Sequence, residues 1–227
     1  MLVHGVIVSS RYFLPLGAQL AAAGLPVVVP DLPGFGHSDR PASAPSPAAL
    51  ADAVVAAARA CGHERVALVG NSFGAQVAVE AARRHPDAVA RLALLGPTVD
   101  PATRPLARLF VRWLRNAPDE HPSSVALMAR DLVDIGARRA AAMVREMVAD
   151  RIEERLPDVA CPVLVVRGAR DRVASPAWCA RVLRLAGGRG EVVELSGGAH
   201  MAHYARAIEM AAALRPFLAA PDAAGAR

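Results

Sequence analysis

The stretch Gly70-Asn71-Ser72-Phe73-Gly74 is the strongest guide to the architecture of this chain, because it has the pattern G-x-S-x-G between two segments of opposite character. The apolar run at residues 65–69 precedes it and is typical of a buried strand. An Ala-rich run at residues 75–82 follows it and favours a helix. A serine at such a tight turn is held in a strained backbone conformation that exposes its hydroxyl, and the flanking glycines allow the turn to close.

Segments that favour strands and helices alternate along most of the chain. This alternation predicts an α/β fold with a mostly parallel central sheet and helices on both faces. Continuous apolar runs suit parallel strands that are buried on both sides. We expect strands at residues 2–3, 26–29, 65–69, 91–95, 162–166 and 191–195. We expect helices at about residues 15–23, 47–60, 73–84, 176–185 and 202–217.

The alternation stops between residues 98 and 157. Helical patterns cover residues 105–115, 123–135 and 138–154, and no convincing strand lies among them. We predict that residues 98–157 form a helical cap, inserted in a core domain of residues 1–97 and 158–227. Such a cap would lie over the carboxyl ends of the strands, where open α/β sheets bind ligands. We expect the C-terminal residues 221–227 to fray.

Bulk composition excludes several classes of protein. The chain has 227 residues, of which 54% are hydrophobic, so it fits one domain with an ample core and is not a disordered protein. No apolar run is long enough to cross a membrane, and no signal peptide is visible. The 3 cysteines are unclustered, which favours a reducing cytoplasm. The net charge of +5 comes from scattered arginines interleaved with acids, which predicts a solvated surface rather than a nucleic-acid site.

A serine hydroxyl becomes an effective nucleophile when a base takes its proton and an acid orients that base. His200 follows the predicted strand at residues 191–195 and a glycine-containing loop, which suits the base. Asp171 follows the predicted strand at residues 162–166, which suits the acid. The chain order is therefore Ser72, Asp171, His200, as expected for a nucleophile on a G-x-S-x-G turn.

Several motifs, in this order, resemble those of the α/β-hydrolase superfamily, and the resemblance covers nearly the whole chain. They are His4-Gly5, the D-x-P-G-x-G-x-S loop from Asp31 to Ser38, the G-x-S-x-G turn, the G-x-x-D loop from Gly168 to Asp171, and Gly198-Ala199-His200. The resemblance implies an enzyme with a small-molecule substrate and no metal or organic cofactor. It implies neither a nucleic-acid nor a membrane partner, and a homo-oligomer stays open.

The same resemblance assigns roles to individual residues. Ser72 would attack a carbonyl carbon, and His200 would act first as base and then as acid. Asp171 would orient and support the imidazolium. The backbone N–H groups of Val6 and Phe73 would form the oxyanion hole.

Some assignments stay open. Asp100 is a rival acid, because some members of the superfamily place the acid after the strand that corresponds to residues 91–95. His203, one helical turn after His200, is expected in a half-exposed position. Candidate residues for an apolar substrate pocket lie in the cap, where packing of the helices onto the core explains them equally well. They are Trp113, Met128 and Met143.

An ester with a small apolar acyl or alcohol part is the expected substrate. The Gly-Asn-Ser-x-Gly turn and the Asp171-Arg172 pair also resemble the carbon–carbon bond hydrolases of aromatic ring-fission products, although the segment after His4-Gly5 lacks their Gly-Pro-Gly loop. Acyl transfer, perhydrolysis and a non-catalytic binding protein stay open. Members of the superfamily usually carry two further strands before the His-Gly segment. Either this lineage has a trimmed sheet edge or Met1 lies inside a longer reading frame, and we favour the second alternative.

Overall fold

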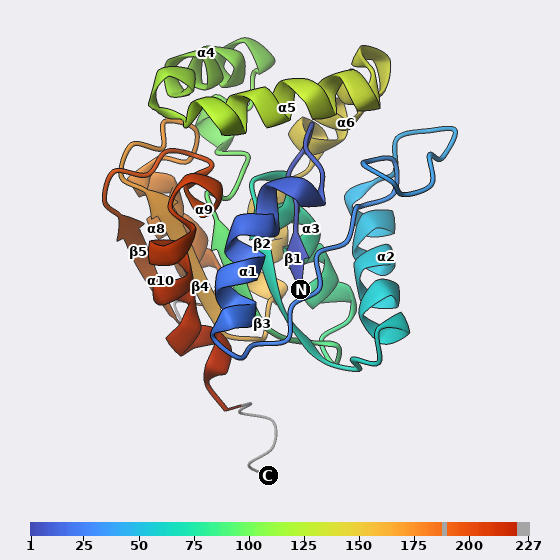
Figure 1. Cartoon of the computed structure of the whole chain (residues 1–227), viewed down its shortest axis with the longest axis vertical. Helices are drawn as coiled ribbons and strands as arrows, with labels where there is room; N and C mark the ends of the chain where they lie inside the picture. Colours follow the sequence, from blue (N-terminus) through green and yellow to red (C-terminus); the bar gives the residue numbers. More distant parts are fainter. Residues whose placement is uncertain (188–189, 222–227) are drawn as a thin grey trace.

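The computed structural model of the protein describes residues 1–187 and 190–221. Within these residues a 5-stranded parallel sheet has the strand order β1-β2-β3-β4-β5, as Figure 1 shows. The strands are β1 (Leu2–Val3), β2 (Val66–Asn71), β3 (Val89–Leu95), β4 (Val163–Gly168) and β5 (Gly190–Leu195). The predicted α/β fold is therefore confirmed. Residues 222–227, for which fraying was predicted, lie outside the described part.

Helices cover both faces of the sheet. One face carries α1 (Leu14–Ala22), α9 (Ala202–Ala205) and α10 (Ala207–Ala219). The other face carries α2 (Pro47–Ala60), α3 (Phe73–Arg84) and α8 (Pro176–Leu185). None of these helices is long and apolar enough to cross a membrane, and the same holds for every other helix of the described residues.

The central strands β3 and β4 are mostly apolar because both of their faces are buried. Successive side chains of a strand point to opposite sides of the sheet. In β4, Val163 and Val165 belong to the hydrophobic cluster under α2, α3 and α8. Leu164 and Val166 belong to the cluster under α1 and α10. The central strands of such a sheet therefore read as uninterrupted apolar runs.

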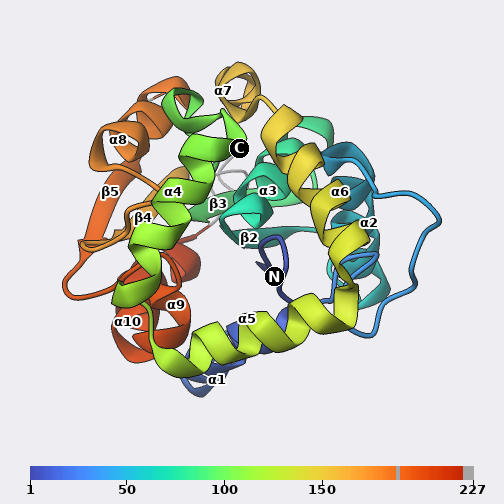
Figure 2. The same ribbon diagram turned by 90° about the horizontal axis from the view of Figure 1, so that it is seen from above.

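Further helices follow β3 and precede β4. They are α4 (Leu106–Asn116), α5 (Pro122–Ile135), α6 (Ala137–Ala149) and the short α7 (Ile152–Arg155). Figures 1 and 2 show α4, α5 and α6 as a layer above the end of the sheet at which β2 leads into α3. A side-chain bond fastens this layer to the core, since Nε2 of Gln76 on α3 donates to the Met147 carbonyl over 3.0 Å. The division into a core domain and a cap at residues 98–157 stays a prediction.

The structure corrects some of the predicted elements. Residues 26–29 are not a strand: they lie beside β1, which has only 2 residues, and a bond from the Leu2 N–H to the Val28 carbonyl (2.9 Å) joins the two segments. The helix expected at 202–217 breaks at Arg206, whose φ of −131° lies outside the helical region. The helix expected at 138–154 ends before Asp150, which turns the chain so that its buried carboxylate pairs with Arg155.

Candidate active site

Ser72 stands at the turn between β2 and α3 with a left-handed backbone conformation, φ 56° and ψ −118°. Non-glycine residues rarely adopt positive φ, so the surrounding structure must hold the strain. The Ser72 N–H donates to the Leu95 carbonyl of β3 over 3.0 Å, which fixes the turn to the sheet. The hydroxyl does not cap α3. It therefore stays free for chemistry at the end of the sheet.

The two glycines of the turn are required by close backbone approach. A Cβ atom on Gly70 would overlap the carbonyl oxygen of Gly74. A Cβ atom on Gly74 would overlap the carbonyl oxygen of Val3, because α3 begins directly against β1. The G-x-S-x-G pattern is thus a steric condition for this turn.

Asp171 and His200 form a buried pair, and each side chain is 1% exposed. Nδ1 of His200 donates to Oδ2 of Asp171 over 2.9 Å. The other carboxylate oxygen accepts the backbone N–H groups of Val173 (2.8 Å) and Ala174 (2.9 Å). Gly96 leaves room for the pair, because a Cβ atom there would lie 2.8 Å from Oδ2 of Asp171. The acid loop, the histidine loop and the end of β3 therefore meet at one point.

Asp100, the rival acid, makes other hydrogen bonds in the structure. Its Oδ1 accepts the Ala102 N–H over 3.0 Å and so caps a short 3-10 helix. Its Oδ2 lies 3.4 Å from the Ser175 hydroxyl. The structure brings Asp171 to the imidazole of His200 and leaves Asp100 with these local bonds.

Each member of the Asp171–His200 pair stabilises the charged form of the other. Burial would lower the pKa of His200, but the charge and hydrogen bond of Asp171 and the charge of Glu120 together outweigh it, so that the pKa is raised. Burial would raise the pKa of Asp171, but the charge and hydrogen bond of His200 outweigh it, and the pKa is lowered. The arrangement favours an imidazolium beside a carboxylate, which is the state a general base reaches after it has taken a proton.

The hydroxyl of Ser72 faces Thr98, with 3.4 Å between the two side-chain oxygens. Nε2 of His200 is buried and has no hydrogen-bond partner within the described residues. It is thus free to accept a proton. Bonds between a nucleophile and its base are often long without substrate and tighten when substrate binds. Thr98 was not predicted as a site residue, because no pattern in the sequence marks it.

Side chains connect the loop that follows β1 to the elbow, the turn formed by Gly70–Gly74 between β2 and α3. The Gly5 N–H donates to the Tyr12 hydroxyl over 2.6 Å, and that hydroxyl donates to Oδ1 of Asn71 over 3.0 Å. Nδ2 of Asn71 donates to the carbonyls of Leu95 (3.0 Å) and His200 (3.4 Å). Val6, which follows Gly5, is buried in this loop. Its oxyanion role and that of Phe73, at the first position of α3, stay predictions.

The predicted pocket residues of the cap have different surroundings. The ring of Trp113 on α4 meets the ring of His200 edge to face, with 5.9 Å between centroids. Met143 on α6 is fully buried in the hydrophobic cluster on the α3 side of the sheet, and Met128 on α5 packs partly buried against the other cluster. The structure therefore places Trp113 beside the candidate base, and both methionines in packing positions.

The prediction of a half-exposed His203 is wrong. Its ring is completely buried, 4.4 Å from the ring of Tyr12 and 4.5 Å from that of Phe13 between centroids. Helix α9 packs this side chain against the turn before α1, and sequence spacing alone could not show that contact. Glu120, on the loop between α4 and α5, was not predicted either. It is buried close to His200, and a carboxylate in a loop carries no pattern that would have singled it out.

Comparison with known proteins settles the family. Residues 1–213 match the model of a family described as alpha/beta hydrolase family. The chain belongs to the α/β-hydrolase family. Among relatives of this hydrolase, 2-hydroxymuconate semialdehyde hydrolase of Pseudomonas sp. (strain CF600) is 45% identical over 71 residues, which cover 31% of this chain and 25% of that protein. The match thus spans about a quarter of the length of that relative.

Longer matches are to proteins whose names give different activities. RutD of Klebsiella pneumoniae (strain 342), a proposed carbamate hydrolase, is 30% identical over 214 residues, with 83% of this chain and 79% of that protein covered. Among solved structures, a thermophilic esterase from Thermogutta terrifontis with malate bound has a TM-score of 0.81 at 22% identity, with 96% of this chain and 88% of that chain covered. The esterase structure therefore shares the fold of this chain.

Proposed function

We propose that this hydrolase cleaves a carboxylic ester of a small apolar substrate through an acyl-enzyme. The observation that carries the proposal is the buried Asp171–His200 hydrogen bond of 2.9 Å, together with a serine held in a strained turn whose neighbour Asn71 donates to the His200 carbonyl. An acid–imidazole pair beside a nucleophilic hydroxyl is the arrangement that serine hydrolases of unrelated folds share.

The mechanism follows from the positions of these side chains. Oγ of Ser72 attacks the ester carbonyl carbon while Nε2 of His200 takes the hydroxyl proton. The N–H groups of Val6 and Phe73 donate to the oxyanion of the tetrahedral intermediate, and each such donor contributes about 3–4 kcal/mol to the transition state. His200 then returns the proton to the leaving oxygen, which departs as the alcohol.

The second half of the reaction repeats the first with water. His200 takes a proton from a water molecule, whose oxygen attacks the acyl carbon. The acyl–oxygen bond to Ser72 breaks, the carboxylic acid leaves, and the serine recovers its proton. Asp171 keeps its hydrogen bond to Nδ1 throughout, so that Nε2 always faces the reacting atoms.

Carbon–carbon bond hydrolysis is the second candidate. The 45% identity to 2-hydroxymuconate semialdehyde hydrolase over 71 residues favours it. Such an enzyme cleaves a bond next to a carbonyl group and could use the same serine, histidine and aspartate. The assay of function therefore has to separate the two classes of substrate.

A series of p-nitrophenyl esters of increasing acyl length tests the proposal, with a fluorophosphonate label as a measure of the nucleophile. We expect turnover and labelling in the wild type and neither in Ser72→Ala. Ser43→Ala removes an exposed loop hydroxyl and serves as the matched control, with both signals unchanged. Labelling without ester turnover, but with cleavage of a vinylogous diketone, would support the second candidate. A folded protein that is neither labelled nor active would contradict both.

A further inference from the structure

Side chains of the cap are hydrogen-bonded to both catalytic loops, the loop that carries Asp171 and the loop that carries His200. Asn116 is the last residue of α4, and Glu120 follows the short 3-10 helix Ala117–Asp119. Oε1 of Glu120 accepts Nδ2 of Asn116 over 2.7 Å and the backbone N–H of Met201 over 3.0 Å. Oδ1 of Asn116 accepts the backbone N–H of Arg172 over 3.1 Å. Met201 directly follows His200, and Arg172 directly follows Asp171.

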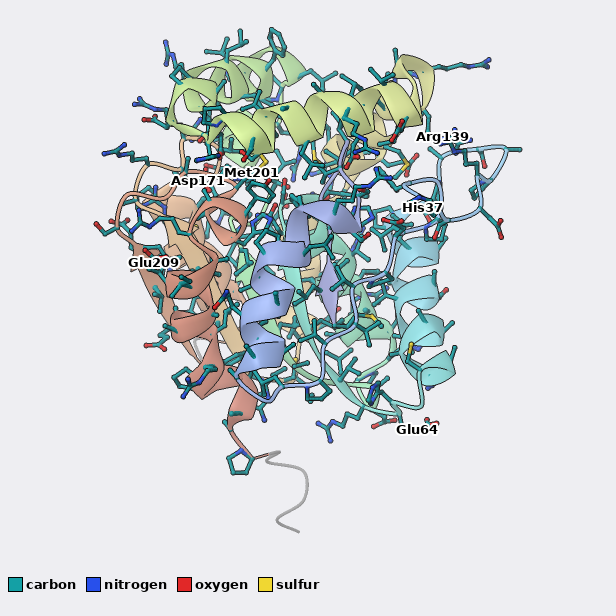
Figure 3. The ribbon with its side chains drawn as sticks, viewed as in Figure 1. His37, Glu64, Arg139, Asp171, Met201 and Glu209 are labelled. Carbon is teal, nitrogen blue, oxygen red and sulfur yellow. The ribbon has the colours of Figure 1, made fainter. Side chains whose placement is uncertain are left out.

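These bonds lie inside the protein. Asn116 is 0% exposed and Glu120 is 8% exposed. The second carboxylate oxygen of Glu120 is buried and has no hydrogen-bond partner within residues 1–187 and 190–221. Figure 3 shows Asp171 and Met201 directly beneath the cap helices. A buried carboxylate is costly, so a position that keeps one needs a compensating interaction.

The nearby positive charge that can compensate is the imidazolium of the base. Three titratable groups interact with His200: Asp171 on the acid loop, Glu120 on the cap, and His203 on α9. Burial would lower the pKa of His200, but Asp171 and then the Glu120 charge raise it. Burial raises the pKa of Glu120, against the charge of His200 and the hydrogen bonds from Met201 and Asn116.

We propose that Asn116 and Glu120 are positioning residues that clip the cap to both catalytic loops, and that Glu120 supplies a second negative charge that supports the imidazolium of His200. The inference rests on the proposed function, since it concerns the same histidine. Its chemical consequence is that the base is strongest while the clip is closed. The cap would thus contribute to proton transfer in addition to covering the substrate.

Glu120→Gln separates charge from shape, because the amide oxygen can still accept the Met201 N–H. The pKa of the His200 imidazole is measured by NMR titration, and the pH dependence of fluorophosphonate labelling of Ser72 is measured alongside. Removal of a negative charge destabilises the imidazolium. The pKa of His200 should therefore fall by about 0.5 unit or more, and the acidic limb of the labelling rate should move to lower pH with it.

Glu209→Gln is the matched control. Glu209 is an exposed residue of α10 that pairs with Arg206, so the same charge is removed where solvent screens it. The His200 pKa should not change in this variant. Asn116→Ala leaves the Glu120 charge in place and removes its amide donor and the bond to Arg172. It should lower the labelling rate several-fold.

The outcomes are distinct. An unchanged His200 pKa in a Glu120→Gln protein that is folded by circular dichroism overturns the inference. A lower melting temperature of that variant would not rescue it, because a residue with a purely structural role would also lower the melting temperature. If Glu120→Gln does not fold, an Asn116→Ala variant with wild-type labelling overturns it. If the wild type is not labelled at all, the proposed function fails, while the NMR titration still decides whether Glu120 acts on His200.

Discussion

The hydroxyl of Tyr12 joins the loop after β1 to the elbow, since it accepts the Gly5 N–H over 2.6 Å and donates to Oδ1 of Asn71 over 3.0 Å. Tyr12 is 1% exposed, and burial raises the pKa of its phenol, so the group stays protonated and can fill both roles. Asn71 precedes Ser72 and also holds the carbonyl of His200. One hydroxyl therefore joins the candidate oxyanion loop to the turn that carries the candidate nucleophile, Ser72.

Tyr12→Phe should lower both stability and activity. The change leaves the Gly5 N–H and the Asn71 side-chain oxygen buried without a partner, which costs about 1–3 kcal/mol in the free energy of unfolding. Urea denaturation measures that loss, and kcat should fall because Val6 is no longer held. Tyr204→Phe is the control: the Tyr204 hydroxyl has no hydrogen bond within the described residues, and stability should stay within about 0.5 kcal/mol of the wild type. Equal losses in the two variants would contradict the role of this bond.

Asp171→Asn should reduce kcat by about 10⁴-fold, because an amide stabilises the wrong tautomer of the imidazole. Asp100→Asn is the matched substitution at the rival position. Since Asp100 caps a 3-10 helix, that variant should lose at most about 1 kcal/mol of stability and keep kcat within a few-fold. Steady-state kinetics with the best ester of the series measure both. The assignment of the acid is wrong if Asp100→Asn is the inactive variant.

Gly74→Ala should disrupt the elbow. The added methyl group would overlap the carbonyl oxygen of Val3, which is backbone and cannot move aside, so we expect a loss of about 3 kcal/mol or more. Gly17→Ala is the control, because a Cβ atom inside α1 meets its nearest neighbour at 3.6 Å. That variant should be as stable as the wild type or gain about 0.5–1 kcal/mol. The melting temperatures of the two variants are compared with that of the wild type. A stable, active Gly74→Ala protein would refute the steric argument.

His203→Leu should make the protein more resistant to acid. Burial lowers the pKa of His203 from 6.5 to about 3, and neither ring nitrogen has a hydrogen-bond partner in the part that the structure describes. The folded-state pKa lies below the unfolded one, so stability is unaffected above pH 6.5 and is lost as the pH falls toward 3. At pH 5 this loss amounts to about 2 kcal/mol.

The measurement is the difference in unfolding free energy between pH 8 and pH 5. It should be about 2 kcal/mol smaller in His203→Leu than in the wild type. His63→Leu replaces a partly exposed histidine of the turn after α2 and should leave the difference unchanged. An unaltered pH dependence in His203→Leu would show that the buried ring is not the acid-sensitive group.

The elbow and the order of the motifs could be predicted, because they depend on neighbours along the chain. Gly70 and Gly74 are required by the geometry of one turn, and the bounds of α2, α3 and α8 agree with the predicted ranges. The breaks at Asp150 and Arg206 could not be predicted in the same way. Each lies where two helices take different packing partners, and periodicity does not carry that information.

The sequence alone determined the fold class and predicted the G-x-S-x-G turn and the loop that carries His200, since short-range backbone constraints and buried periodicity specify them. Tertiary contacts brought Asp171 rather than Asp100 to the imidazole of His200, placed Glu120 near the same imidazole and buried His203 against two aromatic rings. These are contacts between segments far apart in the chain. Their distances depend on how helices pack over the end of the sheet, and a local pattern of residues does not encode that packing.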